Sequence, residues 1–321
     1  MIPKIALEEH FMLPEMLPYY EDIYTTVTHE SGALWMPKLM DFGQIRLDHM
    51  DAAGIERSVL SLTAPGVQRE KNLSKATQAA KACNDSLAAR IAARPDRYSA
   101  FAHLPMQDPD AAAKELERCT KELGFVGALV NGQTDGVYLD DPRYEVFWAT
   151  VAALKAPIYL HPGNPIDRPS VYNGRDPLWG AVWSWMTETS AHALRLVVSG
   201  VFERHPDAKL ILGHMGECIP FHLWRIDQRY PDSNLVGYRL PKPPSFYIKK
   251  NIAITTSGVF DDAPLRCSID NLGADNIMFS VDYPYEDSKF AGEWIENIQL
   301  DSTTKSKICY DNAKRILNLK K

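Results

Sequence analysis

The chain has 321 residues, of which 45% are hydrophobic and 24% are charged, and its formal net charge is −6. These values are typical of a globular protein and argue against a disordered chain. The negative charge, with no cluster of Lys and Arg residues, excludes nucleic acid as an expected partner.

The cysteines and the N-terminus indicate the cellular compartment of the protein. The five cysteines are an odd number without a C-x-x-C spacing, which is typical of a reducing compartment. Charged residues occur from Lys4 onward, too early for a signal peptide, and no apolar run approaches the length of about 18 residues that a membrane span needs. We therefore expect a cytoplasmic protein with no membrane partner.

Short apolar segments alternate with longer segments of helical periodicity along the whole chain. The predicted strands are Lys4–Glu8, Arg57–Leu62, Tyr98–Ala102, Phe125–Val130, Ile158–Leu160, Lys209–Leu212, Ile252–Thr255 and Ile277–Ser280. The predicted helices include Leu73–Arg94, Asp108–Leu123, Pro142–Lys155, Glu188–Arg204 and Asp261–Leu272. Eight strands alternating with helices predict an α/β fold with a closed, TIM-like (β/α)₈ barrel that forms one domain over residues 1–321. The sequence has no G-x-G-x-x-G or phosphate-binding loop motif, which weakens the nucleotide-binding alternatives.

Two segments interrupt this alternation. Phe11–Phe42 forms an insertion after the first strand, and Asn164–Trp183 forms a long loop after the fifth. Both follow the carboxyl end of a strand, which is the side where barrel enzymes carry their active sites. Long segments at this position are typical of lids or binding loops, and contacts between subunits are the alternative.

Four potential metal ligands stand at the carboxyl ends of three predicted strands. Glu8 and His10 end the first strand, His161 the fifth and Asp282 the eighth. Because Glu8 and His10 are two residues apart, their side chains share one face of a strand. Two imidazoles and two carboxylates at one barrel mouth suit Zn²⁺ or Mn²⁺.

The other histidines have simpler interpretations. His103 also ends a predicted strand and competes for a place in the metal site. His192 lies within a helical pattern. The remaining ones, which we interpret as surface or hydrogen-bonded core residues, are His29, His49, His205 and His222.

A second polar pair follows the sixth predicted strand. His214 and Glu217 are three residues apart at the start of a predicted helical stretch, so they can share a face and form a hydrogen bond. A carboxylate beside an imidazole favours the charged ring, as acid–base catalysis requires. The alternative is a carboxylate that interacts with a helix dipole beside a packed histidine. We expect no role for Cys218, because no separate base accompanies it.

The fourth predicted strand indicates how many metal ions to expect. It is followed by Asn131 and has no lysine at its end, whereas a binuclear site in this type of barrel generally needs a bridging ligand there. We therefore expect one divalent metal per chain and no organic cofactor.

Five blocks of sequence resemble one enzyme family. They are Ala6–Phe11, Gly124–Gly132, Tyr159–Pro162, Ile211–Glu217 and Met278–Pro284. In this order they resemble the γ-resorcylate (2,6-dihydroxybenzoate) and 2,3-dihydroxybenzoate decarboxylases of the amidohydrolase superfamily, over nearly the whole chain. His10 resembles the γ-resorcylate group more closely. The segment Ser61–Gly66 combines features of both groups.

The resemblance implies the chemistry. It implies non-oxidative, metal-dependent loss of CO₂ from an ortho-hydroxybenzoate in the catabolism of aromatic compounds, with 2,6-dihydroxybenzoate favoured over 2,3-dihydroxybenzoate and salicylate. It implies a metal held by Glu8, His10, His161 and Asp282, and a homodimer or homotetramer. We assign Asp282 as the acid that protonates the ring, supported by His214 and Glu217. Residues that match substrate-proximal positions are Asn131, Trp185 and Arg225.

Two other functions remain open from the sequence. The same barrel and metal could activate water for hydrolysis of a lactone or an amide. A catalytically idle barrel that acts as a binding protein is a third possibility, which predicts neither stoichiometric metal nor turnover.

Overall fold

The computed structural model describes residues 1–20, 28–233 and 238–319. The strands are β1 (Lys4–Phe11), β2 (Ile55–Leu62), β3 (Tyr98–Ala100), β4 (Ala102–His103), β5 (Ala128–Asn131), β6 (Ile158–His161), β7 (Leu210–Leu212), β8 (Ile252–Thr255) and β9 (Ile277–Met278). The helices are α1 (His29–Met40), α2 (Gln44–Ala53), α3 (Leu73–Ala92), α4 (Pro109–Lys121), α5 (Glu145–Leu154), α6 (Ser184–Val198), α7 (Val201–Arg204), α8 (Ile219–Arg229), α9 (Pro244–Asn251), α10 (Asp262–Leu272), α11 (Ser288–Asn297), α12 (Ser302–Ser306) and α13 (Asn312–Ile316).

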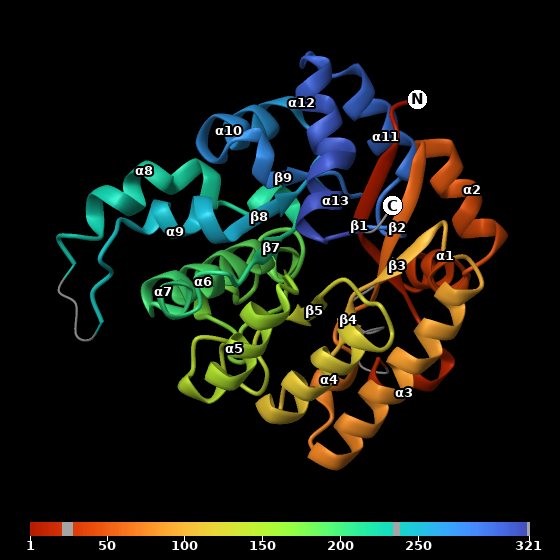
Figure 1. The fold of residues 1–321 in the computed structure, drawn as a ribbon, viewed down its shortest axis with the longest axis horizontal. Helices are drawn as coiled ribbons and strands as arrows, with labels where there is room; N and C mark the ends of the chain where they lie inside the picture. Colours follow the sequence, from red (N-terminus) through yellow and green to blue (C-terminus); the bar gives the residue numbers. More distant parts are fainter. Residues whose placement is uncertain (21–27, 234–237, 320–321) are drawn as a thin grey trace.

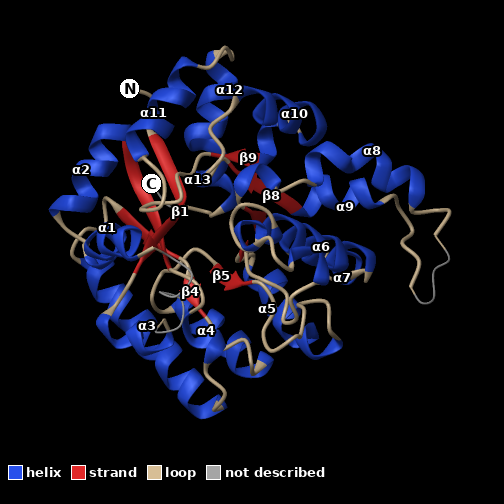
Figure 2. Cartoon of the chain, turned by 180° about the vertical axis from the view of Figure 1, so that it is seen from behind, coloured by secondary structure: helices blue, strands red, loops and turns tan. Residues whose placement is uncertain are grey.

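The strands form one parallel ring. The sheets β1-β2-β3 and β4-β5-β6-β7-β8-β9 meet at Phe101, the one residue between β3 and β4, whose backbone amide donates to the carbonyl of Leu60. At the other seam the amide of His10 donates to the carbonyl of Tyr283 over 2.8 Å. Helices surround these strands (Figure 1), and the reverse view shows the same arrangement (Figure 2). The predicted (β/α)₈ barrel is confirmed.

The barrel interior is filled by one apolar layer. Each strand contributes to it, except that Phe101, between β3 and β4, takes the place of these two strands. Its members are Ile5, Leu7, Val59, Phe101, Leu129, Tyr159, Ile211, Ala253 and Met278, with Ala313 and Leu317 from the C-terminal segment packed against them. A second, larger group of buried apolar side chains fills the space between the strands and the helices. The layer inside the ring makes the barrel a solid support for the polar side chains above it.

A bulge in β1 decides which of its side chains enter the barrel. Ala6 pairs with Ser58 and Glu9 pairs with Leu60, so β1 has one residue more than β2 in this interval. Ile5 and Leu7 point into the barrel, and without the bulge Glu9 would follow them by simple alternation. The extra residue changes the alternation, so that Glu8 and His10 face inward instead.

The boundaries of two elements differ from the prediction, and each difference has a physical cause. The predicted helix Glu188–Arg204 is two helices, α6 and α7, separated at Gly200, which has a left-handed φ of 78°. β5 begins at Ala128, three residues later than predicted. It follows Gly127, where a side chain would come within 2.3 Å of the carbonyl of Pro157.

The two predicted insertions are present but differ in structure. The first contains α1 and a short 3₁₀ helix, Pro14–Tyr19, while its residues 21–27 lie outside the described part. Trp35 of α1 packs on Tyr285, whose ring lies 5.6 Å from that of His10, so this insertion reaches the neighbourhood of the predicted metal ligands. The second insertion contains two short 3₁₀ helices, Ser170–Tyr172 and Asp176–Leu178. Among the described residues, no helix is long and apolar enough to cross a lipid bilayer.

Candidate metal centre and active site

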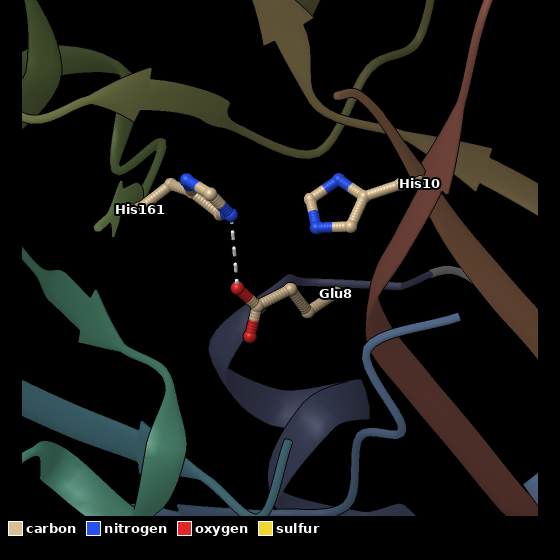
Figure 3. A group of neighbouring side chains, drawn as sticks. All are labelled: Glu8, His10 and His161. Carbon is tan, nitrogen blue, oxygen red and sulfur yellow. Dashed lines mark ion pairs between the residues drawn. The ribbon is translucent and has the colours of Figure 1, made fainter. Parts of the chain in front are cut away.

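Glu8, His10 and His161 come together at the mouth of the barrel (Figure 3). One potential ligand atom from each lies within 4.8 Å of the others, and all three side chains are buried. The rings of His10 and His161 meet edge to face at 5.0 Å between centroids. Three of the four predicted ligands therefore surround one point.

The protonation of His161 can be deduced from its contacts. Its Nδ1 lies 2.9 Å from the carbonyl oxygen of Pro162, which can only accept a hydrogen bond, so Nδ1 carries the hydrogen. Burial, and then the neighbouring His10, lowers the pKa of His161 to about 3, so the ring is neutral. Its Nε2 therefore bears a lone pair, and this lone pair faces Oε1 of Glu8 at 3.5 Å.

Two acceptor atoms that face each other in a buried site repel unless a positive charge lies between them. Oε1 of Glu8 and Nε2 of His10 are buried and have no hydrogen-bond partner. Burial raises the pKa of Glu8, as expected for a carboxylate without a full counter-charge. Together with Nε2 of His161, these atoms fit as ligands of a divalent cation that accepts nitrogen and oxygen ligands.

Asp282 lies next to this group. Its Oδ1 is 3.2 Å from Nε2 of His10 and its Oδ2 is 3.6 Å from Nε2 of His214. It occupies a turn four residues beyond β9 with a φ of 80°. The buried carboxylate of Glu9 accepts a hydrogen bond from the amide of Val281 over 3.1 Å, which ties this turn to β1. Glu9 was not predicted, because its outward-facing position becomes apparent only with the bulge.

His214 and Glu217 interact as predicted, but not on a helix. Nδ1 of His214 lies 3.2 Å from Oε1 of Glu217. The segment is a tight turn in which His214, Met215, Gly216 and Glu217 all have positive φ values, so the expected helical face is wrong. Side chains three apart meet because the turn folds back on itself.

His214 and Asp282 have pKa values that are shifted in opposite directions. Burial alone would lower the pKa of His214, but the carboxylates of Glu8, Glu217 and Asp282 raise it well above its usual value. Burial alone would raise the pKa of Asp282, but the nearby imidazoles of His10 and His214 hold it below its usual value. In this arrangement the proton resides on His214.

Two of the predicted substrate-binding residues border the centre. Asn131 ends β5 in register with His161, and its Oδ1 is buried without a partner. Trp185 at the start of α6 lies 6.5 Å from the His161 ring, and its Nε1 is likewise unpartnered. Arg225, in contrast, is exposed on α8, and among the described residues no contact joins it to the centre.

His103, the competitor for a place in the metal site, and His192 both have structural partners. Nε2 of His103 accepts a hydrogen bond from the amide of Val67 over 2.9 Å, and Nε2 of His192 accepts one from the amide of Leu139 over the same distance. Within the described part of the chain, neither belongs to a group of possible metal ligands. β5 ends in Asn131, as the sequence shows, and no lysine accompanies it at the strand end.

Comparisons with known proteins agree with this geometry. A sequence profile described as "Amidohydrolase" matches residues 9–319. The chain is 45% identical to the γ-resorcylate decarboxylase of Rhizobium sp. (strain MTP-10005) over 325 residues, which cover 98% of each chain. It superposes with a TM-score of 0.93 on a crystal structure of 2,6-dihydroxybenzoate decarboxylase complexed with 2,6-dihydroxybenzoate, at 44% identity, covering 99% of this chain and all of that one.

A further similar structure is the dihydroxybenzoic acid decarboxylase of Polaromonas sp. JS666 with bound manganese and the inhibitor 2-nitroresorcinol. Its TM-score is 0.92 at 42% identity, and the match covers 99% of this chain and 97% of that one. Both the profile and the relatives span almost the entire chain. The protein belongs to the amidohydrolase family, in the group of the γ-resorcylate decarboxylases.

Proposed function

We propose that the protein is a metal-dependent carboxy-lyase that removes CO₂ from an ortho-hydroxybenzoate, with 2,6-dihydroxybenzoate as the favoured substrate. The observation that carries this proposal is the lone pair of His161 facing Oε1 of Glu8, beside the buried Nε2 of His10, which forms no hydrogen bond. The proposal also draws on the relatives named γ-resorcylate decarboxylase, which share this fold over the whole chain.

One divalent cation belongs in this proposal, with Glu8, His10, His161 and Asp282 as its ligands. Manganese is favoured over zinc, because the Polaromonas structure contains manganese. When bound, the cation supplies positive charge that holds the substrate carboxylate and the adjacent ring oxygen. The absence of a lysine at the end of β5 supports one ion rather than two.

Asn131 and Trp185 offer hydrogen bonds to a second ring hydroxyl. Oδ1 of Asn131 can only accept, and Nε1 of Trp185 can only donate. A hydroxyl group can do both, so a substrate with two hydroxyls satisfies atoms that are otherwise buried without partners. This complementarity supports 2,6-dihydroxybenzoate, with 2,3-dihydroxybenzoate and salicylate as weaker candidates. Arg225 has no assigned function in a single chain.

Proton delivery is the part of the reaction that the protein itself performs. His214 holds the proton at Nε2, 3.6 Å from Oδ2 of Asp282, and Glu217 stabilises the charged ring from the other side. In the proposed step Asp282 takes this proton and passes it to the ring carbon that carries the carboxylate. The electron pair of the carbon–carboxylate bond then returns to the ring as CO₂ leaves, so one proton is consumed for each CO₂ released.

Two further features belong to the proposal. All five cysteines are free, which supports a cytoplasmic location. Phe221 and Trp224 on α8 are 77% and 75% exposed, and such side chains support a homodimer or homotetramer in which this helix is covered. Light scattering of the purified protein measures the subunit number.

The direct experiment is to incubate the manganese-loaded protein with 2,6-dihydroxybenzoate and to follow CO₂ and the dihydroxybenzene product. Equal amounts of both support the proposal. Turnover of a panel of lactones and amides, without CO₂ release from any hydroxybenzoate, would establish the hydrolase alternative instead.

A further inference from the structure

Tyr159 is buried in the apolar layer of the barrel, yet its hydroxyl group forms a hydrogen bond that packing alone does not require. It precedes His161 by two residues in β6, so both side chains point into the barrel. Its hydroxyl lies 2.5 Å from Oε2 of Glu8. An ionised carboxylate can only accept, so Tyr159 is the donor.

Two hydroxyl groups of the strand β8 region hold the Tyr159 hydroxyl in place. Thr255 Oγ1 lies 2.8 Å from it and Ser257 Oγ lies 3.4 Å from it, and these two are 3.0 Å apart. Ser257 also accepts a hydrogen bond from the backbone amide of His214 over 3.0 Å. The Glu8 carboxylate is therefore connected through Tyr159 to the turn that carries His214.

Gly213 provides the space for this group. It has ordinary backbone angles, φ −72° and ψ −170°, so its lack of a side chain is not needed for the conformation. A methyl group here would lie 2.7 Å from Oε2 of Glu8, 2.9 Å from the Tyr159 hydroxyl and 3.0 Å from Oγ of Ser257. The end of β7 thus leaves room for the hydrogen bond between Tyr159 and Glu8.

The two oxygens of Glu8 have different environments as a result. Oε2 receives the proton of Tyr159, whereas Oε1 faces His161 and has no hydrogen-bond partner. If Tyr159 only filled space in the apolar layer, a phenylalanine would serve equally well. The hydroxyl instead occupies Oε2 and leaves Oε1 without a hydrogen bond.

We propose that Tyr159 is a positioning residue of the metal centre, which holds Glu8 as a ligand through the single atom Oε1. This inference rests on the proposed metal site. The hydrogen bond from Tyr159 keeps Oε2 turned away and prevents the carboxylate from rotating. Partners of this kind that orient a ligand typically change metal affinity by about 10- to 100-fold when removed.

The test compares Tyr159→Phe with a matched control. Tyr247 is also buried and also donates to a carboxylate, Oε2 of Glu203, over 2.5 Å, but it lies on α9 outside the barrel. The Mn²⁺ dissociation constants of the parent, Tyr159→Phe and Tyr247→Phe are measured by competition with a metal-sensitive dye. The melting temperature of each metal-free protein is measured in chelator.

We expect Tyr159→Phe to bind Mn²⁺ at least about tenfold more weakly than the parent, with Tyr247→Phe unchanged and both metal-free variants similarly stable. Gly213→Ala retains every donor and acceptor and should also weaken binding, because it displaces Glu8. Affinity within threefold of the parent in Tyr159→Phe, equal losses in the two tyrosine variants, or parental affinity in Gly213→Ala would each overturn the positioning role. A parent protein that binds no Mn²⁺ would instead refute the proposed metal site.

Discussion

Asp282 lies between two imidazoles, with Oδ1 3.2 Å from Nε2 of His10 and Oδ2 3.6 Å from Nε2 of His214. This position allows one carboxylate to contact both the metal centre and the proposed proton donor. Asp282→Asn retains the shape but removes the group that receives and transfers the proton. We expect CO₂ release to fall by roughly 10³-fold while the fold survives. An activity within tenfold of the parent, with metal and substrate still bound, would show that Asp282 does not transfer the proton.

Removal of one imidazole tests the metal centre. His161→Ala deletes a neutral imidazole that we propose as a metal ligand, and it leaves Glu8 and His10 facing an empty space. The parent should retain about one equivalent of manganese per chain after dialysis, and the variant should lose most of it. Elemental analysis with a protein assay provides both values. Two firmly held equivalents in the parent would mean that the absence of a lysine at the end of β5 was misinterpreted.

His103 provides the control for this experiment. It is buried like His161 and also ends a strand, but its Nε2 accepts a hydrogen bond from the amide of Val67. We expect His103→Gln to keep its manganese, because the substitution does not touch the centre. A drop in melting temperature measured in chelator is the expected cost of the lost bond. Loss of manganese from the His103→Gln variant with an unchanged melting temperature would instead indicate that His103 is a metal ligand.

Glu217 should control the pH range in which the enzyme works. Its carboxylate is among the groups that raise the pKa of His214, so the charged ring persists to higher pH in the parent and is lost as the pH rises through that pKa. Glu217→Gln removes this effect. We expect the alkaline limit of kcat/KM to move to lower pH, with a smaller change at acidic pH. An unchanged profile, or a shift to higher pH, would show that Glu217 does not act through His214.

Most of the fold was predictable from the sequence because the periodicity of buried parallel strands is strong. Ile252–Thr255 was placed at its observed bounds, and the ring follows from the alternation of strands and helices, with β3 and β4 together in the place of the third of the eight predicted strands. The shared face of Glu8 and His10 was also predictable from their spacing. That this face is the inner one depends on the bulge between Ala6 and Glu9, and no residue type in this stretch marks the extra residue.

The parts of the site that the sequence did not reveal depend on tertiary contacts. The turn from His214 to Glu217 has positive φ at four successive residues, although only Gly216 among them favours that conformation. Tyr159 could have been noted, since it lies on the same strand face as His161. Its role, however, depends on Glu8, which is 151 residues away in the sequence. The exposed position of Arg225 on α8 was likewise not apparent from the resemblance on which its assignment rested.

The central claim is that a hydroxyl next to the carboxylate is needed for recognition and reaction. The most direct measurement is CO₂ release from 2-, 3- and 4-hydroxybenzoate and from 2,3- and 2,6-dihydroxybenzoate, with the manganese-loaded protein under one set of conditions. We expect the fastest release from 2,6-dihydroxybenzoate and none from 3-hydroxybenzoate. 4-Hydroxybenzoate should be nearly inert, because it retains the electron-donating oxygen but loses the positioning that two adjacent oxygens provide. Release from 4-hydroxybenzoate as fast as from the best ortho compound would contradict the account, even for a protein that is a decarboxylase.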